Sequence, residues 1–309
     1  MPNLYETGSG LTRIQVVDAV LNFAENTAAF TRLSDSPLGL VKYLQLDDIV
    51  YAFRDAMTEA IEVYITSDHE ASDEWLQESV RLATPVRCDF WDSPGPYVNH
   101  WIFTDIEKQV VHVVIETTTN VFSHFSFGRV ERYGVYTGGH YCTGHKYDNA
   151  TRPFSPISSI RNKIPWESGS SSANGQFYHP IGLGGAADFA NIGSSANGRR
   201  AEGTLARGVS DTTFLISMIF RNTPQQLNGQ AVGLPIQIFV EDINNTLVDF
   251  PMGFVPGVQL VNMGDTILPK SLLLSNEWIV FPLSELNGDG TAAPNSFTHG
   301  LAYQFVVEG

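Results

Sequence analysis

Glycine and proline occur throughout this 309-residue chain, and their positions restrict its fold more than any other feature of the sequence. In the C-terminal part they fall between or inside nearly all of the apolar segments: Pro224, Gly229, Gly233, Pro251, Gly253, Pro256, Gly264, Pro269 and Pro294. Both residue types mark turns and interrupt regular elements, so they favour short strands over long helices. We therefore expect a mainly β fold with a minor α component (α+β), built from β-sandwich or barrel-like domains.

The apolar pattern predicts few helices and many strands. Apolar residues recur every three or four positions over Thr12–Leu33, where Thr12 is a candidate N-cap, and over the shorter segment Ser72–Leu82. The segment Lys108–Thr119 is rich in β-branched residues, which favour a pleated, half-buried surface. Further strand candidates are Ala60–Thr66, Thr212–Arg221, Leu234–Glu241, Val255–Asn262, Leu272–Phe281 and Leu301–Glu308.

Changes in composition along the chain indicate how it is divided. Residues 1–84 form an acidic N-terminal α+β region and residues 85–167 a central β region, against which the C-terminal β region, 201–309, is expected to pack. Between them lies 168–200, where Ser168–Gly198 is mostly glycine, serine and alanine. A structureless loop of this length is uncommon in a compact domain. We expect a long extended insertion that becomes ordered on a neighbouring subunit, with a flexible loop as the alternative.

The charge balance excludes one class of partner. Lys and Arg number 18 against 33 Asp and Glu, which gives a formal net charge of −15. Sequence-independent binding to nucleic acid needs an excess of basic side chains, so we do not expect it. Acidic residues are concentrated in Asp47–Glu78, where Arg54 is the only base. This segment is interpreted as a solvated surface, or alternatively as a negative patch for a basic partner or a divalent cation.

The low charge content bears on the surface of the protein. Only 17% of residues are charged, while 11% are aromatic, a combination that indicates a surface covered by another protein. No segment has the apolar length of a membrane span, and the N-terminus has no pattern of a secretory signal. We therefore expect no membrane span and no export.

One segment concentrates residues that bind metals. His140, Cys142 and His145 lie close together, and His124 is available to complete a set of four ligands. His140 and Cys142 would share one face of a strand because they are two positions apart. The spacing is not a strong zinc pattern, and the alternative is that these side chains are satisfied within an aromatic-rich sheet. Since motifs for nucleophilic catalysis and for phosphate binding are missing as well, we expect no catalytic residues, no metal and no cofactor.

A group of aromatic residues surrounds a proline-rich turn. Trp91, Tyr97 and Trp101 flank the segment Asp92–Pro96. Exposed rings of this kind stack on sugar rings, so the group suggests a carbohydrate-binding or carbohydrate-cleaving module as an alternative function. The other interpretation is that these rings flank the turn and fill the core.

Other runs of residues resemble structural proteins of tailed-bacteriophage virions. These runs are Phe90–Tyr97 (FWDSPGPY), the strand Val110–Thr119, His124–Gly128 (HFSFG) and Tyr133–Gly139 (YGVYTGG), and more loosely Trp278–Pro282 and Tyr303–Val307. The resemblance implies a non-enzymatic component of the tail, baseplate or neck that acts through protein–protein contacts. It also implies other virion subunits as partners, a homo-oligomeric ring or another symmetric assembly, and a place in the virion after assembly in the cytoplasm of a host bacterium.

Overall fold

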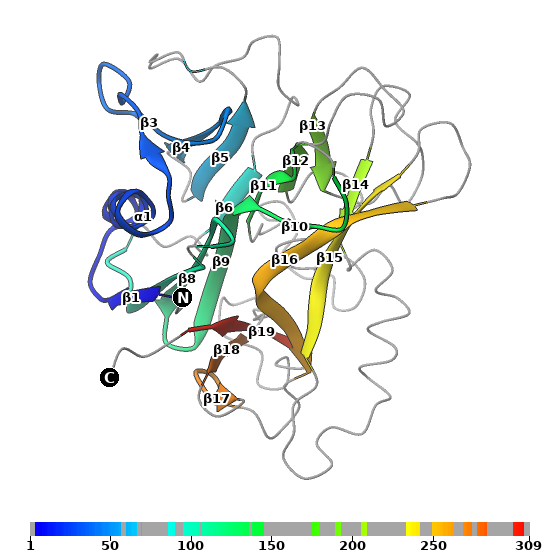
Figure 1. Ribbon diagram of the computed structural model, residues 1–309. Helices are drawn as coiled ribbons and strands as arrows, with labels where there is room; N and C mark the ends of the chain where they lie inside the picture. The colour runs from blue at the N-terminus through cyan, green and yellow to red at the C-terminus, as the bar shows by residue number, and fades with distance from the viewer. Residues whose placement is uncertain are drawn as a thin grey trace, which may run out of the picture.

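The computed structural model describes the chain in segments (Figure 1). They cover residues 4–56, 60–66, 69, 86–89, 95–105, 107–135, 138–144, 175–178, 189–192, 205–208, 233–241, 249–262, 268–273, 277–282 and 299–305. Within these segments, one α-helix accompanies strands that belong to two sheets.

The elements follow one another along the chain as strands with a single early helix. The N-terminal elements are β1 (Leu4–Gly8), α1 (Arg13–Thr27), β2 (Thr31–Arg32), β3 (Val41–Leu46), β4 (Ile49–Ala56), β5 (Ala60–Thr66) and β6 (Val86–Asp89). The central strands are β7 (Asn99–Asp105), β8 (Val110–Thr118), β9 (Val121–Arg129), β10 (Glu131–Arg132) and β11 (His140–Gly144). The later strands are β12 (Gly175–Tyr178), β13 (Phe189–Ile192), β14 (Leu205–Gly208), β15 (Gly233–Glu241), β16 (Asp249–Asn262), β17 (Leu272–Leu273), β18 (Trp278–Pro282) and β19 (His299–Gln304).

The larger sheet has 14 strands and the smaller one has five. The larger sheet runs in the order β1-β7-β8-β9-β11-β12-β13-β14-β15-β16-β19-β18-β17, with β10 paired to β16 beside this path. The smaller sheet runs β2-β3-β4-β5-β6. Among the described strands, β13 and β14 form a parallel pair and the other pairs are antiparallel.

The larger sheet bends so that two of its parts face each other across a hydrophobic cluster. This cluster joins Phe103 and Val114 of the central strands to Val255 and Tyr303 of β16 and β19. The opposite face of the central strands packs on α1 and the smaller sheet, in a second cluster. Figure 1 shows α1 with β3–β5 on one side of β8 and β9, and β16, β18 and β19 on the other. We call β7, β8, β9 and β11 the middle layer, because they are covered on both faces.

Strand β8 shows why the sequence produces such a layer. Val111, Val113 and Ile115 belong to the cluster on the α1 side, whereas Val110 and Val114 belong to the cluster on the side of the later strands. A strand buried on one face alternates between apolar and polar residues, but a strand buried on both faces is apolar at nearly every position. The β-branched run Val110–Thr118 is of the second kind.

The helix begins where the sequence predicts and ends earlier. At its N-terminus, Gln15 Oε1 accepts a hydrogen bond of 2.9 Å from the backbone N–H of Thr12. The prediction of a helix as far as Leu33 is wrong, because α1 ends at Thr27 and Ala29 has a positive φ of 58°. Phe30 continues the helical spacing of apolar residues in the sequence. In the structure it is buried in the core, but it lies between the end of α1 and β2 and not in the helix.

The fold class is confirmed, since the described protein is mainly β with one helix. The barrel alternative is wrong for the described residues, where neither sheet closes on itself. Strand β5 has the predicted bounds, and β8, β15, β16 and β19 overlap their predictions. The strand predicted at Leu272–Phe281 is divided into β17 and β18. The helix predicted at Ser72–Leu82 and the strand predicted at Thr212–Arg221 lie outside the described residues.

The division into regions can be compared with the packing of the described residues. Described residues of 1–84 and of 85–167 share the cluster on the α1 side, and described residues of 85–167 and of 201–309 share the other cluster. In the segment 168–200, β12 and β13 are strands of the chain's own larger sheet. Ordering of these two short strands therefore involves β11 of the same chain.

Gly128 on β9 lies so close to the neighbouring backbone that the middle layer has no room for a side chain there. It has a φ of +135°, and a Cβ atom there would lie 2.4 Å from the carbonyl oxygen of Gln109 and 2.7 Å from Val110 Cα. Because both neighbours are backbone atoms, we expect Gly128→Ala to lower the free energy of unfolding by about 3 kcal/mol or more, measured by urea denaturation. Gly134 has no atom within 4 Å of such a Cβ, so Gly134→Ala is the matched control. Equal effects of the two substitutions would contradict this interpretation.

Candidate functional site

The middle layer contains a chain of buried polar groups on its face toward the later strands. His112 Nε2 lies 2.8 Å from the carbonyl oxygen of Pro256, which can only accept, so this nitrogen carries the proton. In the neutral ring, Nδ1 then accepts from Ser126 Oγ at 2.8 Å. Ser126 Oγ in turn accepts from the Tyr141 hydroxyl at 2.7 Å. These contacts connect β8, β9, β11 and β16, and the hydrogen bonds run in one direction, from Tyr141 through Ser126 and His112 to Pro256.

A second histidine on the same face repeats this arrangement. His124 Nε2 donates to the carbonyl oxygen of Pro282 at 3.2 Å, and His124 Nδ1 accepts from the Tyr303 hydroxyl at 3.0 Å. The Tyr303 ring stacks on Phe103, with 5.2 Å between ring centroids. His112 and His124 together therefore attach β8 and β9 to β16, β18 and β19. We call these two histidines with their partners the histidine clasp.

Burial determines the protonation of the clasp. Burial lowers the pKa of His112 from 6.5 to about 4, and the hydrogen bond to Pro256 opposes this only in part. Burial also raises the pKa of Tyr141 and holds that of Tyr303 well above its usual value. The side chains of the two histidines and of their hydroxyl partners are at most 1% exposed: His112, His124, Ser126, Tyr141 and Tyr303. Burial therefore favours the neutral forms of His112, Tyr141 and Tyr303 at pH 7, and the side chains of the clasp are too deeply buried to touch a substrate.

His140 lies on the opposite face of the middle layer, in a different network. The Tyr51 hydroxyl donates to the carbonyl oxygen of Gly128 at 2.8 Å, so it accepts from His140 Nδ1 at 3.1 Å. His140 Nε2 then faces Asp47 Oδ2 at 3.6 Å. Arg129 Nη1 lies 2.6 Å from that same carboxylate oxygen. Burial lowers the pKa of His140 to about 4, although Asp47 raises it.

The candidate metal ligands are only partly brought together. His140 and Cys142 do share one face of β11, on the α1 side. His124 is paired with Val114 on the opposite face, so it is not available to complete a set with His140 and Cys142. His145 lies outside the described residues. Over the segments that the structure describes, no three His, Cys, Asp or Glu side chains gather as a metal site would require.

The aromatic group is divided between two clusters rather than presented to solvent. Tyr97 is 2% exposed and belongs to the cluster on the α1 side. Trp101 is 9% exposed and contacts Phe281 in the other cluster, with 4.8 Å between ring centroids. Trp91 lies outside the described residues. The two described rings fill the core, as one of the two interpretations holds, and do not form a surface on which sugars stack.

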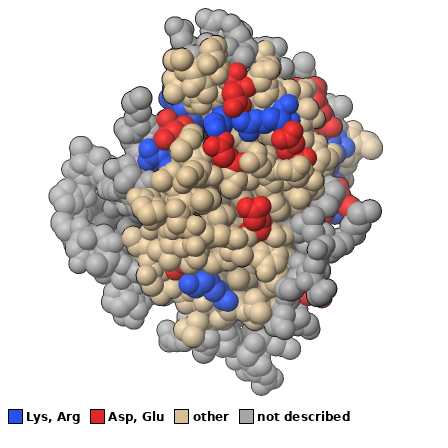
Figure 2. Space-filling model, turned by 90° about the vertical axis from the view of Figure 1, so that its left-hand side faces the viewer, with Lys and Arg blue, Asp and Glu red and all other residues tan. Residues whose placement is uncertain are grey.

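The described acidic residues of Asp47–Glu78 are largely paired within the chain. Asp47 pairs with Arg129, Asp55 pairs with Arg13, and Glu62 pairs with Arg54. Figure 2 shows Lys and Arg alternating with Asp and Glu in a band across one face. The described part of this segment is therefore a set of charged pairs and not a uniformly negative patch.

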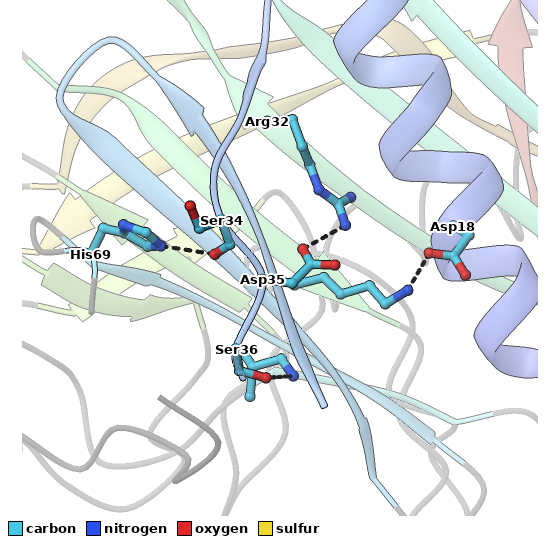
Figure 3. A network of polar contacts seen from close by, with 8 residues as sticks. Asp18, Arg32, Ser34, Asp35, Ser36 and His69 are labelled. Atoms are coloured by element: carbon cyan, nitrogen blue, oxygen red, sulfur yellow. Dashed lines mark hydrogen bonds and ion pairs between the residues drawn. The ribbon is translucent and has the colours of Figure 1, made fainter. Parts of the chain in front are cut away.

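A further network of polar and charged contacts lies at the start of the smaller sheet (Figure 3). Arg32 Nη2 donates to Asp35 Oδ1 at 2.6 Å, and Lys42 on β3 pairs with Asp18 on α1. His69 Nε2 donates to the carbonyl oxygen of Ser34 at 3.2 Å. These contacts attach the smaller sheet to α1 and to the chain that precedes β3.

Beside the band, Figure 2 shows a broad area with almost no charged side chains. The view faces the side on which Figure 1 places α1 and β1. Large apolar side chains are partly exposed on these elements: Tyr5 on β1 is 36% exposed and Ile14 on α1 is 37% exposed. Other exposed apolar residues of the described chain are Leu38, Leu40, Val98, Tyr133, Val135, Leu268 and Leu272. We call the area beside the band the uncharged face.

Comparison with known proteins does not assign the chain to a family. No protein-family model matches the sequence, and no curated protein matches it. Among the described residues, no helix has the length and apolar character needed to cross a membrane.

The histidine clasp was not predicted from the sequence, although a signal for it exists. His112 interrupts the β-branched run of β8, and Ser126 follows His124 two positions later in β9. Polar residues at alternate positions inside an otherwise apolar, doubly buried strand indicate a buried hydrogen-bond network. The partners of that network, Pro256, Pro282 and Tyr303, depend on the packing of remote strands.

Ser126 provides a test of the clasp. Ser126→Ala removes the hydroxyl that joins His112 to Tyr141, so we expect the free energy of unfolding to fall by about 2 kcal/mol. Ser9 is exposed, and Ser9→Ala is the matched control, for which we expect a change within about 0.5 kcal/mol. Both values would be measured by urea denaturation at pH 7.5. A change below about 0.5 kcal/mol for Ser126→Ala would show that the network is not stabilising.

Proposed function

We propose that this chain is a structural, non-enzymatic subunit of a tailed-bacteriophage particle, in its tail, baseplate or neck. Two observations together support the proposal. The protein has a broad uncharged face, and several of its buried polar side chains form hydrogen bonds within the chain. Three of the described histidines, His112, His124 and His140, are buried in the clasp or beside Tyr51. Extended apolar and uncharged areas on a protein surface are typical of interfaces with other proteins.

The resemblance to virion proteins supports the same proposal. Two of the runs that carry it, Val110–Thr119 and His124–Gly128, correspond to β8 and β9 of the middle layer. A third run, Tyr133–Gly139, follows β10 and includes the exposed residues Tyr133 and Val135. These runs therefore supply both the centre of the fold and part of its exposed apolar surface.

Charge indicates how copies and partners would meet. A net charge of −15 makes copies of the chain repel one another at long range. A symmetric homo-oligomer, such as a ring, therefore needs contacts through surface that carries little charge, and the uncharged face has this property. Other virion subunits are the remaining partners of the proposal, with assembly in the cytoplasm of the host bacterium.

Analysis of purified particles tests the proposal. Particles from a culture that produces this chain would be purified on a density gradient after nuclease treatment, and their proteins quantified by mass spectrometry. We expect the ratio of this chain to the major capsid protein to be constant across the particle fractions, because a structural subunit occupies a fixed number of positions. Abundant host proteins serve as the control, since their ratio to the capsid protein should vary. Absence of the chain from the particles, or a ratio that varies like that of host proteins, would contradict the proposal.

A further inference from the structure

Strand β1 forms an open edge of the larger sheet. It stands first in the strand order, and among the described strands it pairs only with β7. An edge strand presents backbone N–H and C=O groups to which another strand can add. Tyr5, Glu6 and Thr7 on β1 are exposed, so this edge is accessible. Figure 1 places β1 on the side of the molecule that Figure 2 faces.

Contacts with β7 hold this edge strand in place. Thr7 Oγ1 donates to the carbonyl oxygen of His100 at 2.9 Å. The His100 ring packs against the backbone of β1, since a Cβ atom at Gly8 would lie 2.5 Å from His100 Cε1. The Tyr5 ring stacks on that of Phe103, with 6.1 Å between centroids. Because β1 is already ordered, an added strand finds a preformed template and orders little of this chain when it binds.

Glu6 on this edge carries a charge that no cation of the described chain balances. Over the part of the chain that the structure describes, Lys and Arg form their ion pairs with other carboxylates. His100 Nε2 lies 4.0 Å from Glu6 Oε1, which is too far for a hydrogen bond, and this nitrogen is buried without a partner among the described residues. Burial lowers the pKa of His100, so the ring supplies no positive charge at pH 7.

The surroundings of Glu6 define the strand that fits this edge. The Glu6 side chain is 49% exposed, and burial of the remainder raises the pKa of its carboxyl group. A neighbouring cation opposes this effect, because it favours the charged carboxylate. In an added strand, the residue directly opposite Glu6 lies roughly 5 Å away and on the same face of the sheet. A Lys or Arg at that position pairs with Glu6, while the residues on either side of it lie on the face of the Tyr5 ring and are best apolar.

Charge argues against a second copy of this chain as the source of that strand. Two β1 strands that pair antiparallel over their full length, Leu4–Gly8, place one Glu6 directly opposite the other. Like charges at directly opposite positions are destabilising. At longer range, the net charge of −15 repels a second copy and attracts a basic protein. The observations therefore favour a different protein with a basic, extended segment.

We propose that β1 is the docking edge for an extended segment of a basic partner protein, which adds to the larger sheet as a further strand and places a Lys or Arg opposite Glu6. Backbone hydrogen bonds to β1 supply the affinity, and Glu6 selects the partner by charge. The proposal names a contact for one of the other subunits that the proposed function requires, and in that respect it rests on that function. Its test uses a synthetic strand and no particles, so either proposal can fail without the other.

Synthetic peptides stand in for the partner segment. The full-length chain would be titrated at low ionic strength into the amidated, fluorophore-labelled peptide Thr-Thr-Val-Lys-Val-Thr-Thr, and into the same peptide with Glu in place of Lys, with fluorescence anisotropy as the readout. We expect the Lys peptide to bind at least about fivefold more tightly, because the residue opposite Glu6 changes from repulsive to attractive. Hydrogen exchange measured by mass spectrometry should slow in β1 when the Lys peptide is bound.

A third peptide separates strand addition from simple attraction between charges. It keeps the Lys but has Pro in place of both Val residues, so it retains the charge and cannot form the hydrogen-bond ladder of a strand. We expect this peptide to bind at least about fivefold more weakly than the Val peptide. Equal binding of the two would overturn the proposal.

Matched variants assign the charge preference to Glu6. Glu6→Gln removes the charge and keeps the size of the side chain, and we expect the preference for the Lys peptide over the Glu peptide to fall below about twofold. Glu25 is exposed on α1, and Glu25→Gln changes the net charge equally, so it should keep the full preference. A Glu6→Gln variant that keeps the preference would overturn the proposal. If this variant does not fold by circular dichroism, the three peptides and hydrogen exchange in the parent chain decide.

The remaining outcomes also contradict the proposal. They are equal affinities of the Lys and Glu peptides for the parent chain, no saturable binding of the Lys peptide at millimolar concentration, and slower exchange only outside β1. Sedimentation of the chain alone tests the other occupant. Dimers in which β1 is protected from exchange without any peptide would show that a second copy takes this edge, and would overturn the proposal as well.

Discussion

The burial of β8 and β9 on both faces is the constraint on which the rest of this structure depends. Adjacent residues of β8 belong to different hydrophobic clusters, Val113 to the one on the α1 side and Val114 to the other. A strand pair that is apolar on both faces needs a cover on each side, so α1 with the smaller sheet and the later strands must both be present. The layered arrangement in Figure 1 is the consequence.

A polar side chain in a doubly buried layer has to find its hydrogen-bond partners within the protein. His112 and His124 find theirs on remote strands, where backbone carbonyls and the Tyr303 hydroxyl satisfy them. These contacts specify how the later strands sit on the middle layer, which apolar packing alone leaves less defined. Charged side chains are instead gathered in pairs on the surface, where Figure 2 shows the mixed-charge band beside the uncharged face.

The sequence predicts the local structure better than the long-range contacts. The β-branched run and the bounds of β5 could be read from residue types, and Thr12 correctly marks the start of α1. The end of α1 could not be predicted, because Phe30 continues the apolar spacing of the helix although it lies beyond the helix end. For the candidate site, the two-residue spacing of His140 and Cys142 correctly places them on one face of β11. The face on which His124 lies depends on the register between β9 and β11, which cannot be read from the sequence.

Truncation of Val113 and Val114, one at a time, tests this account most directly. Both residues are 0% exposed and are neighbours in β8, but their side chains point to opposite covers. If the middle layer is packed on both faces, Val113→Ala and Val114→Ala each lower the free energy of unfolding by about 2 kcal/mol in urea denaturation. A loss for one variant with a change of less than about 0.5 kcal/mol for the other would show that one face of the strand lies uncovered, and would contradict the account.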